Sequence, residues 1–356
     1  MPSVNDELLD RAIRHQIGLE RYSNATVRKI IALLNRVDAD LSAQIQRNDP
    51  TAVNGNWSQR RIVKLLDAVR ATLKEVYQVA RAALNREIRD LGTYEAVFQQ
   101  QSIASTLPLL LDVLTPTPEQ LYAAVHARPF QGALLKDVYS SWEASAQKAV
   151  RDAIRMGFVE GETTAQIVRR VIGTKAQHYE DGVLQINRRH AEAVVRTALA
   201  HTAAVAQNET YKANAGLIKA VRWTSVLDGR TTAVCRARDG RYFPVDRGPR
   251  PPAHWNCRST TVPVLKSFRD LGFDIGDLPE GTRASMNGQI PASVTYNDWL
   301  RTQPREFVED VLGKTKAKLY LDGKLSLDRF VDRKGKELTL EQLRRQDAEA
   351  FALAGV

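Results

Sequence analysis

Apolar side chains in the first 115 residues recur at the three- and four-residue steps of an amphipathic α-helix. Two segments carry this spacing: Val27, Ile30, Ile31, Leu34, Val37, Leu41 and Ile45, and then Ile62, Leu65, Leu66, Val69, Leu73 and Val76. The connection between them, residues 48–55, is rich in Asn, Pro and Gly, which favour turns. We therefore expect two long helices that fold back as a hairpin, either packed on each other or docked on a partner's helices.

Capping residues and glycines divide the following part of the chain into further helices. Thr117 and Gln120 match a capping box that follows a linker at residues 115–118. Thr163 and Gln166 match a second capping box. The predicted helices are 134–156, stopped by Gly157, then 163–173, and then 186–215, stopped by Gly216.

The hydrophobic period changes after Gly216. Val221, Trp223 and Ser225 alternate with Arg222, Thr224 and Val226, which predicts a short strand with Trp223 as a core anchor of a small sheet. The pair 242–243, which follows an Asp-Gly turn, predicts a second strand. A loop that contains glycine and proline is expected over about 271–295.

These elements predict an α+β fold that is mostly α-helical, in which a helical core packs against a small antiparallel sheet. The chain is expected to divide into a helical arm at 1–115, a core at 116–270, and a loop with a helical C-terminal tail at 271–356. Thr339 and Gln342 are expected to cap the last helical segment of that tail.

The chain carries a net charge of +10, and half of it lies in residues 221–260, here called the arginine-rich segment. The segment holds eight arginines and no lysine, against three aspartates. Because planar guanidinium groups match phosphate or carboxylate, the segment is either a solvated basic loop or a contact surface for double-stranded DNA, bound without sequence preference. The candidate phosphate contacts are Arg222, Arg230, Arg236, Arg238, Arg241, Arg247, Arg250 and Arg258.

Both cysteines of the 356-residue chain, Cys235 and Cys257, lie in this segment, and His254 precedes the second by three residues. These three side chains are candidates to hold a structural zinc ion, which takes four ligands in a tetrahedral arrangement. The alternatives are a disulfide formed after release to an oxidising medium, and two buried thiols beside a histidine. Candidates for a fourth zinc ligand are Asp228, Asp239, His190 and His201.

An enzymatic function is not expected. Asp228, Asp239 and His254 could surround a divalent ion for DNA hydrolysis, but each aspartate precedes a glycine in a dipeptide typical of turns. The sequence has no GxxxxGK[ST] phosphate loop and no GxSxG nucleophile elbow. The N-terminus lacks the features of a signal peptide, and no apolar run is long enough to span a bilayer. We therefore expect assembly in a cytoplasm without a membrane partner.

The order of these motifs resembles that of the Mu F-like head-morphogenesis proteins, the minor head proteins of tailed phages. The resemblance covers residues 129–350. It rests on Pro129-Phe130 with Gly132, Arg196-Thr197 on the long helix before Trp223, LDGRTTAVC at 227–235, PPAHWNCRS at 251–259, and tail segments at 296–304 and 327–331. Trp255 departs from the family pattern, because many relatives have a proline at that position.

The resemblance implies a low-copy virion protein, assembled in the host cytoplasm and located inside the head or at the portal vertex. Its implied partners are the portal protein, the capsid and packaged double-stranded DNA. Its implied role is in head morphogenesis, in genome packaging and ejection, or in both. The alternative function is that of a zinc-containing DNA-binding module with a regulatory role. Against that alternative, the sequence shows no basic helix with a helix-turn-helix signature.

Overall fold

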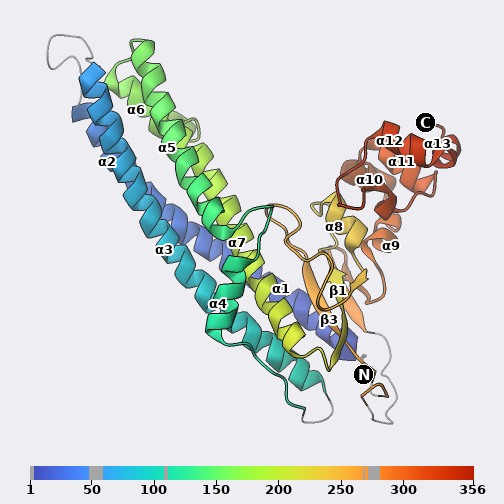
Figure 1. The fold of residues 1–356 in the computed structure, drawn as a ribbon. Helices are drawn as coiled ribbons and strands as arrows, with labels where there is room; N and C mark the ends of the chain where they lie inside the picture. Colours follow the sequence, from blue (N-terminus) through green and yellow to red (C-terminus); the bar gives the residue numbers. More distant parts are fainter. Residues whose placement is uncertain (1–3, 48–58, 108–110, 268, 272–280) are drawn as a thin grey trace. The chain divides into compact units, whose positions relative to one another are not determined.

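The structure, a computed structural model, describes residues 4–47, 59–107, 111–267, 269–271 and 281–356 (Figure 1). Helices dominate these residues, and the strands form two small antiparallel sheets. This confirms the mostly α-helical α+β class expected from the sequence. Contacts within the chain define two compact units: the first comprises 1–20, 93–121 and 203–356, and the second comprises 21–92 and 122–202.

The helices before the first sheet are α1 (Val4–Asn35), α2 (Val37–Arg47), α3 (Gln59–Thr106), α4 (Pro118–Ala127), α5 (Leu135–Val159), α6 (Thr164–Ile172) and α7 (Val183–Ala213), with a 3-10 turn at Lys175–Gln177. Both predicted capping boxes are confirmed. The Thr117 hydroxyl accepts from the Gln120 amide at 3.3 Å, and the Gln120 side chain accepts from the Thr117 amide at 2.9 Å. Thr163 and Gln166 repeat this exchange at the start of α6.

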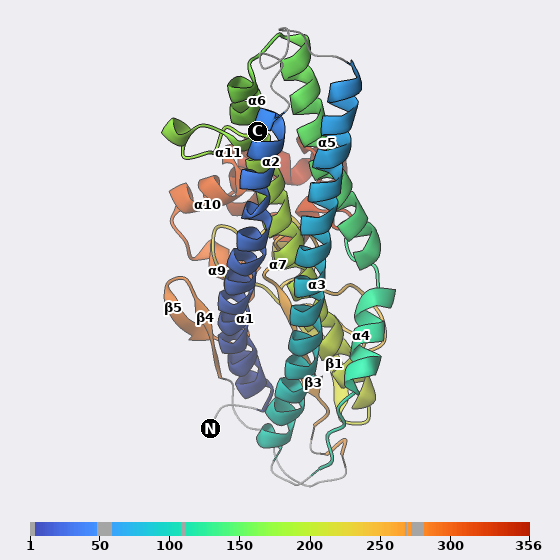
Figure 2. The same ribbon diagram turned by 90° about the vertical axis from the view of Figure 1, so that its left-hand side faces the viewer.

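The antiparallel arrangement of α2 and α1 against α3 is visible in the side-chain contacts of the second unit. Gln44 of α2 donates to the Thr72 hydroxyl at 2.7 Å, and Lys29 of α1 bonds to Glu87 at 2.5 Å. From one contact to the other, the residue number rises along α1 and α2 and falls along α3. The two segments therefore run antiparallel, which confirms the hairpin (Figure 2). The predicted turn between the helices lies in residues 48–58, outside the described residues.

Gly157 lies inside α5 rather than at its end, so the helix stop predicted there is wrong. A Cβ atom at this position would lie 2.6 Å from the Ile167 side chain, which is closer than real carbon contacts allow. The glycine therefore permits α6 to pack closely against α5, which ends two residues later at Val159.

The main sheet contains β1 (Ile218–Thr224), β2 (Tyr242–Phe243) and β3 (Thr260–Leu265), in the order β2-β1-β3, and both pairings are antiparallel. The first two strands agree with the prediction from alternation, and β3 is an addition. A second sheet consists of β4 (Thr282–Ser285) and β5 (Gly288–Pro291). The loop predicted over 271–295 therefore contains a hairpin, and residues 272–280 of it lie outside the described residues.

Short helices follow the strands: α8 (Ala233–Arg238) between β1 and β2, and then α9 (Tyr296–Arg301), α10 (Arg305–Leu312), α11 (Lys314–Leu321), α12 (Leu340–Gln346) and α13 (Ala348–Ala354), with a 3-10 turn at Leu327–Phe330. Figure 1 shows α10 to α13 gathered together at the C-terminal end of the chain. Trp299, Phe330 and Leu343 are buried together in the hydrophobic cluster of these short C-terminal helices. The capping box of Thr339 and Gln342 is confirmed at the start of α12.

The core of the main sheet also includes the two ends of the N-terminal hairpin. Leu9 of α1 and Ile103 of α3 are buried in one cluster with Val221 and Val262 of the sheet. In the same unit, the Asn5 side chain accepts from the backbone amide at the end of β3, at 2.9 Å. The N-terminal helices therefore share a hydrophobic core with the sheet, although the sequence pattern places them in a separate arm.

Across the described part of the chain, none of the helices combines the length and the apolar character that crossing a bilayer requires.

His201 is a buried titratable group of the second unit. It lies on α7 with 4% of its surface exposed. Its Nε2 donates to the Val125 carbonyl at 3.1 Å, and its ring stacks on Phe130 with 4.7 Å between centroids. Burial lowers the pKa of His201 to about 4, because the charged imidazolium loses its hydration.

The free energy of unfolding should therefore fall as the pH decreases from about 7 to about 5. An unfolded histidine binds a proton near pH 6.5, whereas folded His201 stays neutral down to about pH 4. Its contribution is thus present above pH 6.5 and is lost as the pH falls toward 4. At pH 5, wild-type protein should have lost about 2 kcal/mol more than His201→Gln, which keeps a donor without titrating. Chemical denaturation at both pH values measures this, and equal losses in the two proteins would contradict it.

Candidate functional site

Trp223 anchors the region that carries the sequence motifs. It is fully buried on β1, and its indole Nε1–H donates to the Ser225 hydroxyl at 3.0 Å. That hydroxyl also lies 3.0 Å from the Cys235 carbonyl and 3.0 Å from the Ser259 hydroxyl. These bonds join β1 to α8 and to the residue before β3. Cys235 and Cys257 pack with Trp223 in one hydrophobic cluster.

Cys235, His254 and Cys257 converge beside this tryptophan. Their ligand atoms all lie within 4.8 Å of one another. Cys235 Sγ is 3.7 Å from Cys257 Sγ and 3.3 Å from His254 Nε2. The cysteines are buried and the imidazole is partly exposed. The structure thus brings together three candidate ligands that are separated by up to 22 positions in the chain.

The His254 ring is oriented by its other nitrogen. Nδ1 lies 2.8 Å from the Trp255 carbonyl oxygen, which can only accept a hydrogen bond. Nδ1 therefore carries a proton, and Nε2 faces the sulfurs. Both cysteines are free thiols, and their 3.7 Å separation is well above the length of a disulfide bond, about 2 Å.

The two cysteines differ in their acidity because they share a hydrogen bond. The hydrogen bond from Cys235 holds the pKa of Cys257 well below its usual range. Burial opposes this lowering, and His254 adds to it. The same bond, together with burial, raises the pKa of Cys235. Cys257 is therefore the more acidic thiol of the pair, and the His254 imidazole lies beside the pair.

Asp239 and Arg283 form a buried ion pair, with side-chain exposures of 0% and 1%. Arg283 donates to both carboxylate oxygens, at 3.0 and 3.2 Å, and to the carbonyls of Ser225 and Val294. Asp239 also accepts the backbone N–H groups of Ser225, at 2.6 Å, and Tyr296, at 2.7 Å. The carboxylate is thus fully bound by the protein, so it is not free to ligate a metal.

Arg283 was not singled out by the sequence. It lies in β4, inside the range predicted as a loop, and no motif or charge cluster surrounds it. Its strand is only four residues long, Thr-Arg-Ala-Ser at 282–285, and has no alternation that would distinguish it from a loop.

Asp228 is bound in a similar way by an arginine of the PPAHWNCRS segment at 251–259. Arg258 donates to its two carboxylate oxygens at 2.7 and 2.8 Å, and the Arg230 backbone N–H donates to it at 3.0 Å. Burial opposes ionisation, but the bonds from Arg258 hold the pKa of Asp228 below its usual value. Because Arg258 directly follows Cys257, this ion pair fixes the chain beside the cysteine–histidine cluster. The other sequence candidates for a fourth ligand, His190 and His201, lie on α7 in the second unit.

The structure divides the arginine-rich segment into two sets of side chains. One set is bound within the chain. Arg222 donates to the Ala292 carbonyl, Arg236 donates to the Val311 carbonyl, and Arg250 donates to carbonyls of residues 244–249. Arg238 lies over the Trp223 ring, and Arg258 binds Asp228. The other set, Arg230, Arg241 and Arg247, is exposed. Arg241 and Arg247 form exposed ion pairs with Asp328 and Asp246, which contribute little to stability. The exposed set is the part that a phosphate backbone can reach.

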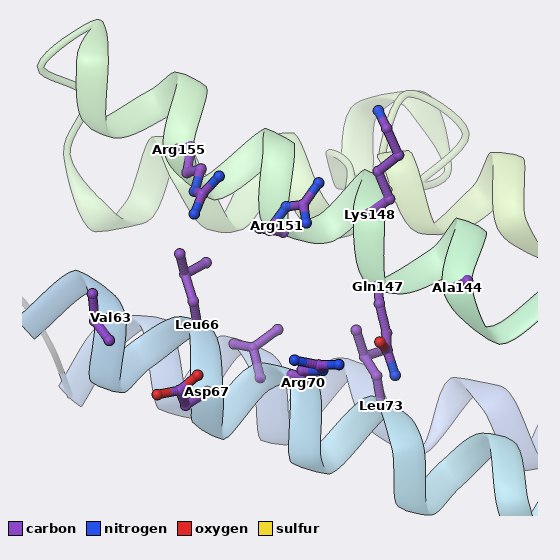
Figure 3. Close-up of a pocket in the computed structure, with 11 residues that line it drawn as sticks. Val63, Leu66, Asp67, Arg70, Leu73, Ala144, Gln147, Lys148, Arg151 and Arg155 are labelled. Carbon is purple, nitrogen blue, oxygen red and sulfur yellow. The ribbon is translucent and has the colours of Figure 1, made fainter.

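A groove in the second unit lies between α3 and α5 and has a volume of 410 Å³ (Figure 3). Leu66, Arg70 and Leu73 line it from α3, while Arg151 and Arg155 line it from α5. Figure 3 shows both α5 arginines above the α3 surface. The groove therefore combines apolar side chains with an excess of cations. No local sequence pattern predicts it, because its two walls lie far apart in the chain.

Comparison with known families identifies one part of the protein. The family model described as phage Mu protein F like protein matches residues 146–262. This confirms the Mu F-like resemblance, over a narrower range than 129–350, and the matched range contains the cysteine–histidine cluster and the arginine-rich segment. No curated protein and no solved structure gives a significant match. The family supports a phage head-morphogenesis protein as the class to which this region belongs.

Breaking the buried pair should destabilise the protein strongly. In Asp239→Asn, Arg283 stays buried without a compensating charge, so we expect the free energy of unfolding to fall by about 3–5 kcal/mol. The matched control is Asp328→Asn, which removes an exposed partner of Arg241 and should cost less than about 1 kcal/mol. Denaturant titration of both variants measures the difference. Equal costs would show that the buried pair has no special role.

Proposed function

We propose that the protein is a minor head protein of a tailed phage, associated with the portal vertex and the packaged DNA and acting in head morphogenesis, in genome packaging and ejection, or in both. The match of residues 146–262 to the Mu F-like family carries this proposal. The proposed location is the virion, inside the head or at the portal vertex. The proposed partners are the portal protein, the capsid and double-stranded DNA.

The proposed role is structural rather than enzymatic. Asp228 and Asp239 are the carboxylates that, together with His254, a metal-dependent nuclease site in this region would need. Both are instead occupied by arginine side chains, Arg258 and Arg283, at hydrogen-bonding distance. This arrangement supports a framework whose charges are neutralised internally and not a site that activates water.

The DNA contact is proposed to come from the exposed arginines of the arginine-rich segment. Arg230 and Arg247 are free of the buried bonds that hold Arg236, Arg250 and Arg258. Exposed guanidinium groups can neutralise phosphates without reading bases, and the net charge of +10 favours association with any duplex.

Replacing Arg230 and Arg247 together with Ala should weaken DNA binding and reduce its dependence on salt. Each lost phosphate contact lowers the magnitude of the log–log salt slope by about 0.9, so the double variant should lose about 2. The matched control replaces Arg70 and Arg155 of the groove, which removes the same charge elsewhere. Fluorescence anisotropy at several salt concentrations measures both. Equal slopes for the two double variants would contradict the proposed contact, and preference for one duplex among unrelated ones would favour the regulatory alternative.

Docking in the head is proposed to use the helical arm of residues 1–115, through the α3 side of the groove between α3 and α5. The groove presents Val63 and Leu66 beside Arg70, an exposed cation without an acidic partner among the described residues. Apolar side chains rimmed by such cations are complementary to an acidic amphipathic segment. We assign that segment to the portal protein.

Changing the groove should therefore remove the protein from phage particles without unfolding it. Val63→Glu with Arg70→Glu places two acidic groups at the groove, and we expect less than about a tenth of the normal copy number in purified DNA-filled heads. The matched control is Lys74→Glu with Val79→Glu, which changes exposed residues of α3 outside the groove lining. Quantitative mass spectrometry of the heads measures incorporation. Normal incorporation of the groove variant would place docking elsewhere.

A further inference from the structure

We propose that Cys235, His254 and Cys257 bind one zinc ion, which fastens the two ends of the inter-cysteine loop (residues 236–256) to each other beside β1. The site belongs to the folded chain itself, so the inference is independent of the phage assignment. It goes beyond a head-morphogenesis role because it gives the region a metal requirement.

The spacing of the three ligand atoms fits a tetrahedral zinc ion. Zinc–sulfur bonds of about 2.3 Å and zinc–nitrogen bonds of about 2.0 Å place two sulfurs about 3.8 Å apart, and a sulfur and a nitrogen about 3.5 Å apart. The corresponding separations are 3.7 Å between the Cys235 and Cys257 sulfurs and 3.3 Å between Cys235 Sγ and His254 Nε2. The third pair lies within 4.8 Å. Small side-chain movements therefore suffice to place an ion at bonding distance from all three.

The orientation of His254 is a second and independent observation. Histidines that ligate metals usually donate their other ring N–H to a carboxylate or a backbone carbonyl, which fixes the ring and its tautomer. The Trp255 carbonyl takes this position at 2.8 Å from Nδ1. Nε2 is therefore the ring nitrogen that faces the sulfurs before any ion arrives.

The donor set selects the metal. Two thiolates and an imidazole are ligands that zinc accepts and that magnesium and calcium do not favour. Zinc with two thiolates and a neutral imidazole has no net charge, which suits a site packed against the fully buried Trp223. Cysteines bind zinc as thiolates, so binding releases protons to solvent.

The fourth coordination position is left to water or to an added ligand. In the portion of the chain that the structure describes, the group of potential metal ligands contains these three residues and no carboxylate. The nearby Asp228 and Asp239 are bound by arginines. Trp255, next in the chain to the partly exposed His254, is 39% exposed.

Metal content and a cobalt spectrum of purified full-length protein test this site. After reduction, incubation with zinc and removal of unbound metal, we expect about one zinc per chain. Cobalt in its place should give the intense visible bands of a tetrahedral ion and a thiolate-to-metal charge-transfer band. Cys235→Ser and Cys257→Ser should each abolish the charge-transfer band or reduce it by about half, because each removes one sulfur ligand.

The histidine ligand and a matched control are tested in the same way. His254→Gln should weaken zinc affinity by about 100-fold or more, measured by competition with a chromophoric chelator. The control His178→Gln changes an exposed histidine of the second unit and should leave affinity unchanged. Circular dichroism of each variant without metal shows whether it is folded. Wild-type protein that keeps two reactive thiols and retains no metal would overturn the proposal, as would a Cys235–Cys257 disulfide in protein purified under anaerobic conditions.

Discussion

The buried ion pair between Asp239 and Arg283 is the interaction on which the motif-bearing region depends. Besides binding each other, the two side chains bind four backbone groups: the N–H and carbonyl of Ser225, the carbonyl of Val294 and the N–H of Tyr296. The end of β1, the turn after α8, strand β4 and the start of α9 therefore meet at one pair of charges. Removing either charge leaves the other buried without a compensating charge, which is far more costly than losing an exposed ion pair.

The rest of the site follows from this junction. Asp239 fixes the chain shortly after Cys235, and the Asp228–Arg258 pair fixes it immediately after Cys257. With both ends of the inter-cysteine loop held, the two sulfurs and the His254 ring are brought to distances that suit a shared ion. The exposed arginines therefore lie on a segment that is already ordered. A flexible loop would instead lose conformational entropy when it binds a partner.

Local sequence signals predicted helices, their capping boxes and the first two strands, because period and capping are encoded within a few positions. The residues of the cysteine–histidine cluster were predicted from their close spacing in the chain. Long-range partners were not predictable in this way. Arg283 is 44 positions from Asp239 and has no distinctive neighbours, and Gly157 was interpreted as a helix stop although it allows close packing of α6. The sequence also could not show that Leu9 and Ile103 complete the core of the sheet, or that most of the arginines are bound within the chain.

The backbone contacts of residues 236–246 are internal to the chain, so this segment should be ordered before DNA or a head protein binds. Amide hydrogen exchange on isolated full-length protein tests this most directly. The Trp223 N–H bonds to the Arg241 carbonyl at 2.8 Å, and the Gly240 N–H bonds back to the Trp223 carbonyl at 2.9 Å. These amides should exchange as slowly as the rest of β1. Exchange across 236–246 at the rate of an unfolded chain would contradict the account, and the loop would then have to be ordered by its partner.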